Sequence, residues 1–576
     1  MKFKRGFRAF PGLLLALVML IGGTSIPAAA ASWRPNFLSR LFISTDLPQI
    51  DMGKWKYQKE DQVYYQAGIQ YAEKSPDSDY DTLAIFVPAA YLNGTANGDG
   101  TYTCTIRENG KTGTYTSETA PMVFPINTPG YAAQKELNGY TDVTDYTNAG
   151  FIYVHVGAQG RDAGAPAGVT DFKAGIRYIR YNQGVIPGNT DAIFTFGMSG
   201  GGAQSAVLGA SGDSALYDPY LDQIGAVQGV SDAVQGSMCW CPITNLDQAD
   251  EAYEWNLGST RSGLSSEEKT ISEDLAKAYA AYINRSGFVD EKGNPLILHP
   301  SEKGIYQAGS YYDYLKREVE TSLNHFLADT SFPYNASAEE SGPAGNPGNL
   351  AGSMNQSEKL DQIQRTQSFS TVLSLSGVYK NRQDYIDALN QNGTWVTYDA
   401  ASNTAKITSI EDFVRNLKNA SKNLGAFDQL DGSQGENTLF GYGDGKGAHF
   451  DAVLAQILKD TNSPYAQSYA EDLEKTDSAG NHVSTRLEMY TPLYYLLPAE
   501  KGYQTSKVAK FWRIRTGINQ GDTALSTEEN LKLALQQYED VKSVDFAMVW
   551  GKGHTMAERS GTATENFIQW VNQCLK

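Results

Sequence analysis

Cysteine is scarce in this chain, with four residues among 576. So few cysteines exclude a disulfide-rich scaffold. A bond within Cys239-Trp240-Cys241 would be strained, and two cysteines without a nearby histidine do not make a tetrahedral zinc site. We therefore expect no metal centre. The sequence leaves open how the thiols pair among Cys104, Cys239, Cys241 and Cys574.

Positive charge is also in short supply. The chain has 47 lysines and arginines against 65 aspartates and glutamates, for a net charge of −18 at pH 7. An acidic protein repels nucleic acid phosphates, and no basic stretch interleaved with aromatic residues argues otherwise. These features exclude nucleic acid as a partner and disfavour anionic substrates over the general surface.

Long apolar runs are missing after the first thirty residues. Lys2, Lys4, Arg5 and Arg8 precede an apolar stretch at residues 13–21 and a small-residue stretch at 27–31. This pattern predicts a secretory signal peptide over residues 1–31, cleaved near Ala30-Ala31, because the apolar stretch is too short to span a membrane. Cleavage removes four positive charges and shifts the net charge from −18 to −22. We expect a secreted protein with no membrane contact after cleavage.

The most informative motif is Gly197-Met198-Ser199-Gly200-Gly201. It follows an apolar run at 192–196 and precedes a small-residue stretch at 202–208. Strand, G-x-S-x-G and helix together indicate a nucleophile elbow, which exposes the serine hydroxyl and directs the amide of Gly200 toward an oxyanion. The alternative is an ordinary glycine-rich turn. We interpret Ser199 as a nucleophile.

Ser199 needs a base and an orienting acid. Of six histidines, His554 lies in a glycine-containing loop after the strand-like run 544–550, whereas His155 lies inside an apolar run and is predicted to pack in the core. Asp522 is the one acid in a short loop after the strand-like run 511–516, before a helix with a predicted capping box at 526–529. An ordinary turn aspartate is the alternative. The order Ser199, Asp522, His554 is typical of α/β-hydrolases.

Strand and helix signals alternate upstream of Ser199. Residues 82–88, 120–125 and 151–156 are predicted strands, and residues 169–181 are a predicted amphipathic helix. The alternation predicts an α/β fold with a mostly parallel, doubly wound sheet. The loop at 126–131 is the expected source of a second oxyanion amide. The proline of this loop has no amide hydrogen, so the donor must be Thr128, Gly130 or Tyr131. We favour Gly130, because glycine allows the closest approach of the backbone.

The chain between Ser199 and Asp522 is much longer than the strand-helix units the fold needs there. We predict a large, mainly helical inserted cap at 241–490, with the catalytic α/β-hydrolase domain at 32–240 and 491–576. Inside the cap, the residue pattern predicts helices at 265–283, 311–327 and 410–417 and a hairpin formed by 395–399 and 405–408.

With these motifs in place, the chain resembles the bacterial tannase branch of the α/β-hydrolases, which includes feruloyl esterase relatives. The matching stretches are 63–68, 127–131, 171–182 with 197–201, 241–247 with 253–255, 513–523 and 550–554. The resemblance implies the triad Ser199, Asp522 and His554 and esters of aromatic acids as substrates. It also implies a lysine and two carboxylates that hold ring hydroxyls, for which the cap offers Lys446, Asp451 and Asp460.

This chain departs from the tannase pattern just after Asp522, where Thr523 and Ala524 replace an expected second acid. The departure leaves open whether the acyl group is galloyl or hydroxycinnamoyl. We expect a secreted serine esterase that acts on a small aromatic ester through an acyl-enzyme and needs no cofactor. A serine peptidase of the same fold and a non-catalytic phenol- or sugar-binding protein are the alternatives, and the oligomeric state stays open.

Overall fold

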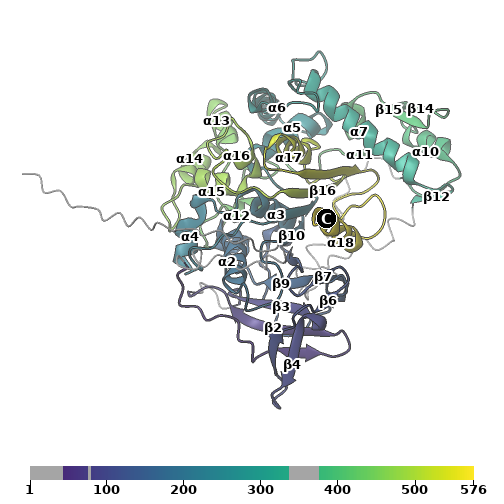
Figure 1. Cartoon of the computed structure of the whole chain (residues 1–576). Helices are drawn as coiled ribbons and strands as arrows, with labels where there is room; N and C mark the ends of the chain where they lie inside the picture. The colour runs from purple at the N-terminus through teal and green to yellow at the C-terminus, as the bar shows by residue number, and fades with distance from the viewer. Residues whose placement is uncertain (1–42, 75–78, 337–374) are drawn as a thin grey trace, which may run out of the picture. The chain divides into compact units, whose positions relative to one another are not determined.

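A sheet of nine strands forms the centre of the part of the chain that the structure describes (Figure 1). The structure is a computed structural model that describes residues 43–74, 79–336 and 375–576, so the predicted signal peptide at 1–31 lies outside the described residues. In spatial order the strands are β1 (Lys56–Gln58), β2 (Val63–Gln70), β3 (Thr82–Pro88), β9 (Ile152–Val156), β8 (Met122–Ile126), β10 (Ile193–Met198), β11 (Gly236–Trp240), β16 (Phe511–Gly517) and β17 (Ser543–Val549).

Most neighbouring strands in this sheet are parallel. Every pair from β9 to β17 runs parallel, whereas β1, β2, β3 and β9 pair antiparallel. Parallel strands are covered on both faces, which favours continuous apolar runs over alternation. All residues of β8 and β9 are accordingly buried. The predicted α/β fold with a mostly parallel sheet is confirmed.

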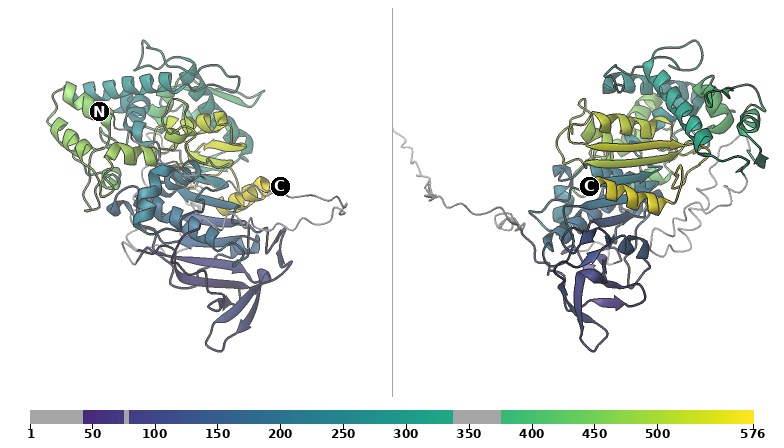
Figure 2. Two further views of the ribbon diagram at one scale, coloured as in Figure 1. Left: turned by 60° about the vertical axis from the view of Figure 1, so that its left-hand side comes forward. Right: turned by 45° about the vertical axis from the view of Figure 1, so that its right-hand side comes forward.

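Helices cover both faces of the sheet. Figure 2 shows α17 (Ser526–Gln537) and α18 (Ala563–Cys574) on opposite sides of β16 and β17. The rings of Phe567 and Trp570 of α18 pack on Phe196 and Phe194 of β10, with centroids 4.4 and 5.5 Å apart. Two further helices flank β10 in sequence, α2 (Ala167–Tyr181) before it and α3 (Gly200–Ala210) after it.

The segment between β11 and β16 adds no strand to the nine-stranded sheet among the described residues. Its main elements are α5 (Ala249–Leu257), α6 (Ser266–Ser286), α7 (Ser310–Asp329), α10 (Arg382–Leu389), β14 (Val396–Asp399), β15 (Thr404–Ile407), α11 (Ile410–Leu417), α13 (Ala452–Asp460), α14 (Ala466–Glu474) and α15 (Val483–Tyr490). Helix α7 packs on α17, where the Tyr311 hydroxyl lies 2.6 Å from the Asn530 side-chain oxygen. The predicted hairpin pairs as β14 and β15.

Shorter elements complete the described chain. They are β4 (Leu92–Ala96), β5 (Tyr102–Ile106), β6 (Lys111–Thr112), β7 (Tyr115–Thr116), β12 (Tyr334–Asn335), β13 (Val378–Tyr379), α1 (Thr144–Asn148), α4 (Asp218–Gln223), α12 (Gly435–Leu439) and α16 (Pro492–Leu496). In these described ranges no helix has both the length and the apolar character needed to cross a membrane.

All four cysteines carry free thiols. Cys104, Cys239 and Cys241 are buried, and burial raises the pKa of the Cys241 thiol to about 12, so this thiol stays protonated. Buried thiols of this kind behave as small apolar side chains. The question of pairing that the sequence leaves open is therefore answered by four unpaired residues.

Substitution of Gly201 tests the packing of α3 against the end of β8. A Cβ atom at Gly201 would lie 2.0 Å from the backbone oxygen of Ile126, which cannot move without displacing β8. We expect Gly201→Ala to lower the free energy of unfolding by about 3 kcal/mol, the upper range for overpacking. Gly139→Ala is the control, because a Cβ there meets no atom within 4 Å. Equal melting temperatures of the two variants would contradict this packing.

Buried carboxyls predict lower stability at alkaline pH. Burial raises the pKa to about 7 or 8 for each of Asp171, Asp247, Glu528 and Glu529. The native state therefore holds protons that the unfolded chain has already lost at pH 6, and it loses stability as they dissociate up to pH 8. Buried His155, with its pKa lowered to about 4, acts in the opposite direction but mainly below pH 6.5.

We expect the melting temperature to be lower at pH 8 than at pH 6 by about 3 °C or more, measured by calorimetry at constant ionic strength. Glu529→Gln should narrow the difference, because that side chain no longer titrates. A melting temperature that rises between pH 6 and pH 8 would show that these carboxyls are already ionised in the native state.

Candidate active site

Ser199 stands at a sharp turn between β10 and α3. Its backbone has φ 59° and ψ −124°, a strained combination for a residue with a Cβ. The Ser199 amide donates to the backbone oxygen of Trp240 at 2.9 Å, which ties the turn to the end of β11. A Cβ at Gly197 would lie 2.4 Å from the backbone oxygen of Gly201, so the turn closes only with glycine at these positions.

His554 reaches Ser199 from the loop that follows β17. Its Nε2 lies 2.8 Å from the Ser199 Oγ, although the two residues are far apart in sequence. The side chains are almost fully covered, with Ser199 4% and His554 5% exposed. A serine hydroxyl in hydrogen-bond contact with an imidazole is the arrangement that allows general-base activation of the oxygen.

The other nitrogen of His554 faces the loop after β16, which carries the predicted acid. Its Nδ1 lies 2.7 Å from Gln520 Oε1 and 3.6 Å from Asp522 Oδ2. Asp522 is therefore close enough for an ion pair, while Gln520 makes the shorter contact. The search for an acid overlooked Gln520, whose only signal in the sequence is its place in the same strand-to-helix loop, two residues before Asp522.

The two predicted oxyanion positions lie side by side. A Cβ at Gly200 would be 3.2 Å from the Gly130 amide nitrogen and 2.5 Å from that of Tyr131. The Tyr131 amide is already bonded to the backbone oxygen of Thr128, whereas Gly130 has φ 55°, a conformation that suits glycine. Arg161 donates to the Gly130 oxygen at 2.8 Å and so fixes this peptide next to α3.

The three predicted substrate-binding residues make local contacts. Lys446 is 82% exposed at its side chain and lies 3.5 Å from Asp444. Asp451 is buried and caps α13 by accepting from two backbone amides, and exposed Asp460 ends that helix and accepts from Gln456. Among the described residues, none of these three side chains forms its hydrogen bonds or ion pairs with Ser199 or His554, so their substrate role stays a prediction.

A buried lysine that the sequence analysis did not consider lies next to the Gln520 loop. Lys418 follows α11 directly, is 1% exposed, and donates through its Nζ to the backbone oxygen of Gln520. Burial lowers the pKa of Lys418 to about 8, against the opposing effect of Glu528, Cys241 and Asp522. No local motif marks it, because its partners lie about a hundred positions away in the chain.

Glu528 is the second buried residue beside the Gln520 loop that the sequence analysis did not consider. The predicted capping box at 526–529 is wrong: α17 begins at Ser526 with Leu525 as its cap, and no side chain makes a capping hydrogen bond there. Glu528 instead turns inward, where its Oε1 accepts from Gln520 Nε2 at 2.9 Å and from Thr516 Oγ1 at 3.1 Å. Burial raises the pKa of this carboxyl to about 7, and the nearby Lys418 opposes that rise.

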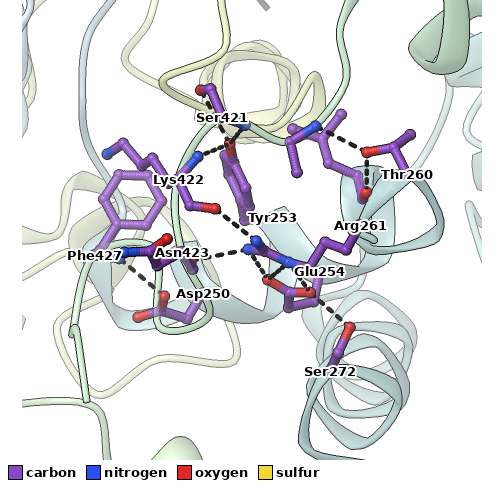
Figure 3. Close-up of polar contacts among 12 residues, drawn as sticks. Asp250, Tyr253, Glu254, Thr260, Arg261, Ser272, Ser421, Lys422, Asn423 and Phe427 are labelled. Atoms are coloured by element: carbon purple, nitrogen blue, oxygen red, sulfur yellow. Dashed lines mark hydrogen bonds and ion pairs between the residues drawn. The ribbon is translucent and has the colours of Figure 1, made fainter. Parts of the chain in front are cut away.

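The stretch after Lys418 fastens the Gln520 loop to α5. The Tyr253 hydroxyl accepts from the amides of Ser421 and Lys422 and donates to the backbone oxygen of Gly521 at 2.9 Å. Figure 3 shows Arg261 holding the other side of this stretch, with hydrogen bonds to the oxygens of Lys422 and Asn423. The inserted segment therefore anchors the loop that faces His554.

Arg261 is itself held by a buried carboxylate. Glu254 accepts from its guanidinium through both carboxylate oxygens, and Ser272 of α6 donates to Glu254 at 2.6 Å. Both partners of this ion pair are nearly covered, with side chains 7% and 1% exposed. Figure 3 shows the pair between α5 and the 421–423 stretch, where it joins two parts of the inserted segment.

Cys241 joins the two loops that carry Gln520 and His554. Its thiol lies 3.1 Å from the backbone oxygen of Thr555 and 3.3 Å from the amide of Gly517. A separate cavity of about 450 Å³ is lined by residues that include Gln159, Asp171, Tyr220, Tyr442, Asp477 and Arg486, and it does not reach Ser199 or His554. That cavity is therefore separate from the contact between Ser199 and His554.

Comparison with known proteins gives one family-model match and many matches to solved structures. Residues 113–304, which include Ser199, match the BD-FAE family model, an esterase domain of the α/β-hydrolases. No curated protein sequence matches the chain. Solved structures do match, and they cover almost the whole chain.

Three tannase structures illustrate the match. Tannin acyl hydrolase from Lactobacillus plantarum is 23% identical over 92% of this chain and 99% of its own, with a TM-score of 0.63. Fusobacterium nucleatum tannase is 25% identical over 89% and 95%, also at 0.63. A tannin acyl hydrolase in complex with ethyl gallate is 24% identical over 89% and 94%, at 0.61. The resemblance to bacterial tannases is confirmed, and the chain shares their fold.

Proposed function

We propose that this chain is a secreted serine esterase that hydrolyses esters of hydroxylated aromatic acids. The observation that carries the proposal is the 2.8 Å contact between His554 Nε2 and the hydroxyl of Ser199 at a strained turn. The esterase family model that spans Ser199 and the tannase-like fold support the same reaction class. We further propose an α/β-hydrolase domain at 32–240 and 491–576, a cap at 241–490 and export through the leader at 1–31.

The proposed reaction is acyl transfer to water through a covalent intermediate. His554 Nε2 takes the Ser199 proton as Oγ bonds to the ester carbonyl carbon, and the oxyanion accepts from the amides of Gly200 and Gly130. Collapse breaks the bond to the alcohol, which leaves with the proton from His554. Water, deprotonated by His554, then attacks the acyl-enzyme and releases the acid, and Ser199 regains its proton. The Asp522 carboxylate at 3.6 Å stabilises the transient imidazolium.

The ligands of similar solved structures support an aromatic acyl group. Two of the matching tannin acyl hydrolase structures are complexes, one with ethyl gallate and one with 3,4-dihydroxybenzoate, and both compounds are hydroxylated aromatics. Lys446, whose side chain is 82% exposed, remains the proposed lysine for the ring hydroxyls. No cofactor takes part in the proposed reaction.

Ester hydrolysis by wild type and Ser199→Ala tests the proposal. With methyl gallate, methyl ferulate and p-nitrophenyl acetate as substrates, we expect wild-type turnover and a loss of about 10⁴-fold or more in kcat for Ser199→Ala. Ser205→Ala is the matched control, because Ser205 is buried on the same helix but bonds to Thr195 and Ser237. Mass spectrometry of quenched wild type should detect an acyl group on Ser199.

The same assay separates the alternatives. Turnover of none of the three esters, or equal turnover by Ser199→Ala, would refute the esterase proposal and favour a binding protein. Turnover of p-nitrophenyl acetate without either aromatic ester would keep the serine mechanism and refute the substrate class. Cleavage of peptide bonds in preference to all three esters would favour a peptidase. The ratio of methyl gallate to methyl ferulate hydrolysis decides between the two acyl groups.

A further inference from the structure

The side-chain amide of Gln520 is held in one orientation by its neighbours. Its Nε2 donates to Thr516 Oγ1 at 2.6 Å and to Glu528 Oε1 at 2.9 Å. Thr516 in turn donates its hydroxyl proton to the same carboxylate oxygen. An ionised carboxylate accepts hydrogen bonds and donates none. The nitrogen of the amide must therefore face Glu528, and its oxygen must face His554.

This orientation dictates where the proton of the imidazole resides. Gln520 Oε1 accepts at 2.7 Å from His554 Nδ1, which must therefore carry hydrogen. In the neutral ring the other nitrogen, Nε2, then has the free lone pair and faces the Ser199 hydroxyl at 2.8 Å. Hydrogen-bond donation consequently runs in one direction through four side chains, from Ser199 to His554, then to Gln520, and finally to Glu528.

We propose that Glu528 is a positioning residue that acts through Gln520 to fix the reactive tautomer of His554. The inference rests on the proposed esterase function and deepens it. In a Ser-His-Asp triad a carboxylate performs this task in direct contact with the imidazole. Here an amide is interposed, and the carboxylate that sets the direction stands one side chain further away.

The charges around Glu528 are suited to this role. Burial raises the pKa of Glu528 to about 7, and Lys418, which also binds the backbone oxygen of Gln520, opposes that rise and favours the ionised carboxylate. The hydrogen-bond direction is therefore set as Glu528 ionises around pH 7. Burial keeps the Cys241 thiol protonated, so it adds no charge beside Lys418. Asp522 is the second carboxylate that raises the pKa of Lys418. A protonated Glu528 would donate a hydrogen bond and would permit the Gln520 amide to turn over. The row of hydrogen bonds from Ser199 through His554 and Gln520 to Glu528, which we call the relay, therefore depends on the negative charge of the Glu528 carboxylate and not only on the shape of this side chain.

A swap of acid and amide tests the relay. Glu528→Gln keeps the size of the side chain and removes its charge, so the amide of Gln520 is no longer forced into one orientation. We expect kcat with the best ester substrate to fall on the order of 100-fold while KM stays within about twofold, since loss of the correct tautomer costs up to about 10⁴-fold in triads whose acid is replaced. Glu529→Gln is the matched control. It removes a buried carboxylate from the next position of α17, and that carboxylate contacts Tyr314 and Lys532.

The double variant Gln520→Glu with Glu528→Gln supplies the rescue. It places a carboxylate against His554 Nδ1 and an amide behind it, so the direction of donation is restored. We expect kcat to recover to within about fivefold of wild type. We also expect the acid limb of the pH profile to shift to higher pH by about one unit, because an adjacent carboxylate favours the protonated imidazole. The shift follows from the new carboxylate beside His554 and shows that it is ionised there. The recovery of kcat is the result that a purely structural role for Glu528 does not predict.

Two results would overturn the relay without affecting the proposed function. One is wild-type kcat in Glu528→Gln while Ser199→Ala is inactive, and the other is a double variant as slow as Glu528→Gln with an unshifted pH profile. If Glu528→Gln does not fold, the kcat of the double variant relative to wild type decides alone.

If wild type hydrolyses no ester, the proposed function fails and the relay is judged by ¹⁵N NMR of labelled histidine, with His554→Asn for assignment. We expect an Nδ1-protonated ring in wild type and an increased Nε2-protonated fraction in Glu528→Gln. Identical spectra would refute the relay.

Discussion

Backbone crowding at the turn after β10 governs the geometry of the whole site. The chain passes so close to Ile126 and Thr128 at Gly200 and Gly201 that no side chain fits there. Ser199 is consequently held with a positive φ, and its hydroxyl projects to the side where the loops after β16 and β17 meet. A strained residue persists only where its surroundings determine it, and here three neighbouring strands do so.

The fold could be predicted because its signals are local. Parallel strands are buried on both faces, so they stand out as short apolar runs, and the predicted strand at 82–88 has the bounds of β3. The predicted helix at 410–417 likewise has the bounds of α11. The predicted cap of α17 is wrong because a local sequence pattern at 526–529 takes no account of tertiary contacts. Glu529, the acid of the predicted box, is buried and contacts Tyr314 and Lys532 in place of the helix start.

The site could be predicted only where its residues adjoin strand ends. Ser199 and His554 each follow a strand of the sheet, and parallel strands bring their ends to one edge. Between Gln520 and Asp522 the choice depends on how the loop at 518–525 turns, and no composition rule reveals that. Lys418 and Glu528 meet through packing of the inserted segment, which sequence patterns do not specify. The prediction for Lys446 rests on the glycine-rich sequence around it, and an exposed turn has the same kind of sequence.

The hydrogen bonds from Tyr253, Ser421 and Lys418 to the backbone of Gln520 and Gly521 carry a consequence for the architecture of the enzyme. Insertions in such folds are commonly regarded as detachable additions to a self-sufficient core. In this chain His554 contacts a loop whose peptide groups are bound by residues of the segment between β11 and β16. Excising residues 241–490, the proposed cap, would therefore remove the partners of that loop, and the shortened protein would lose the support of the His554 side chain.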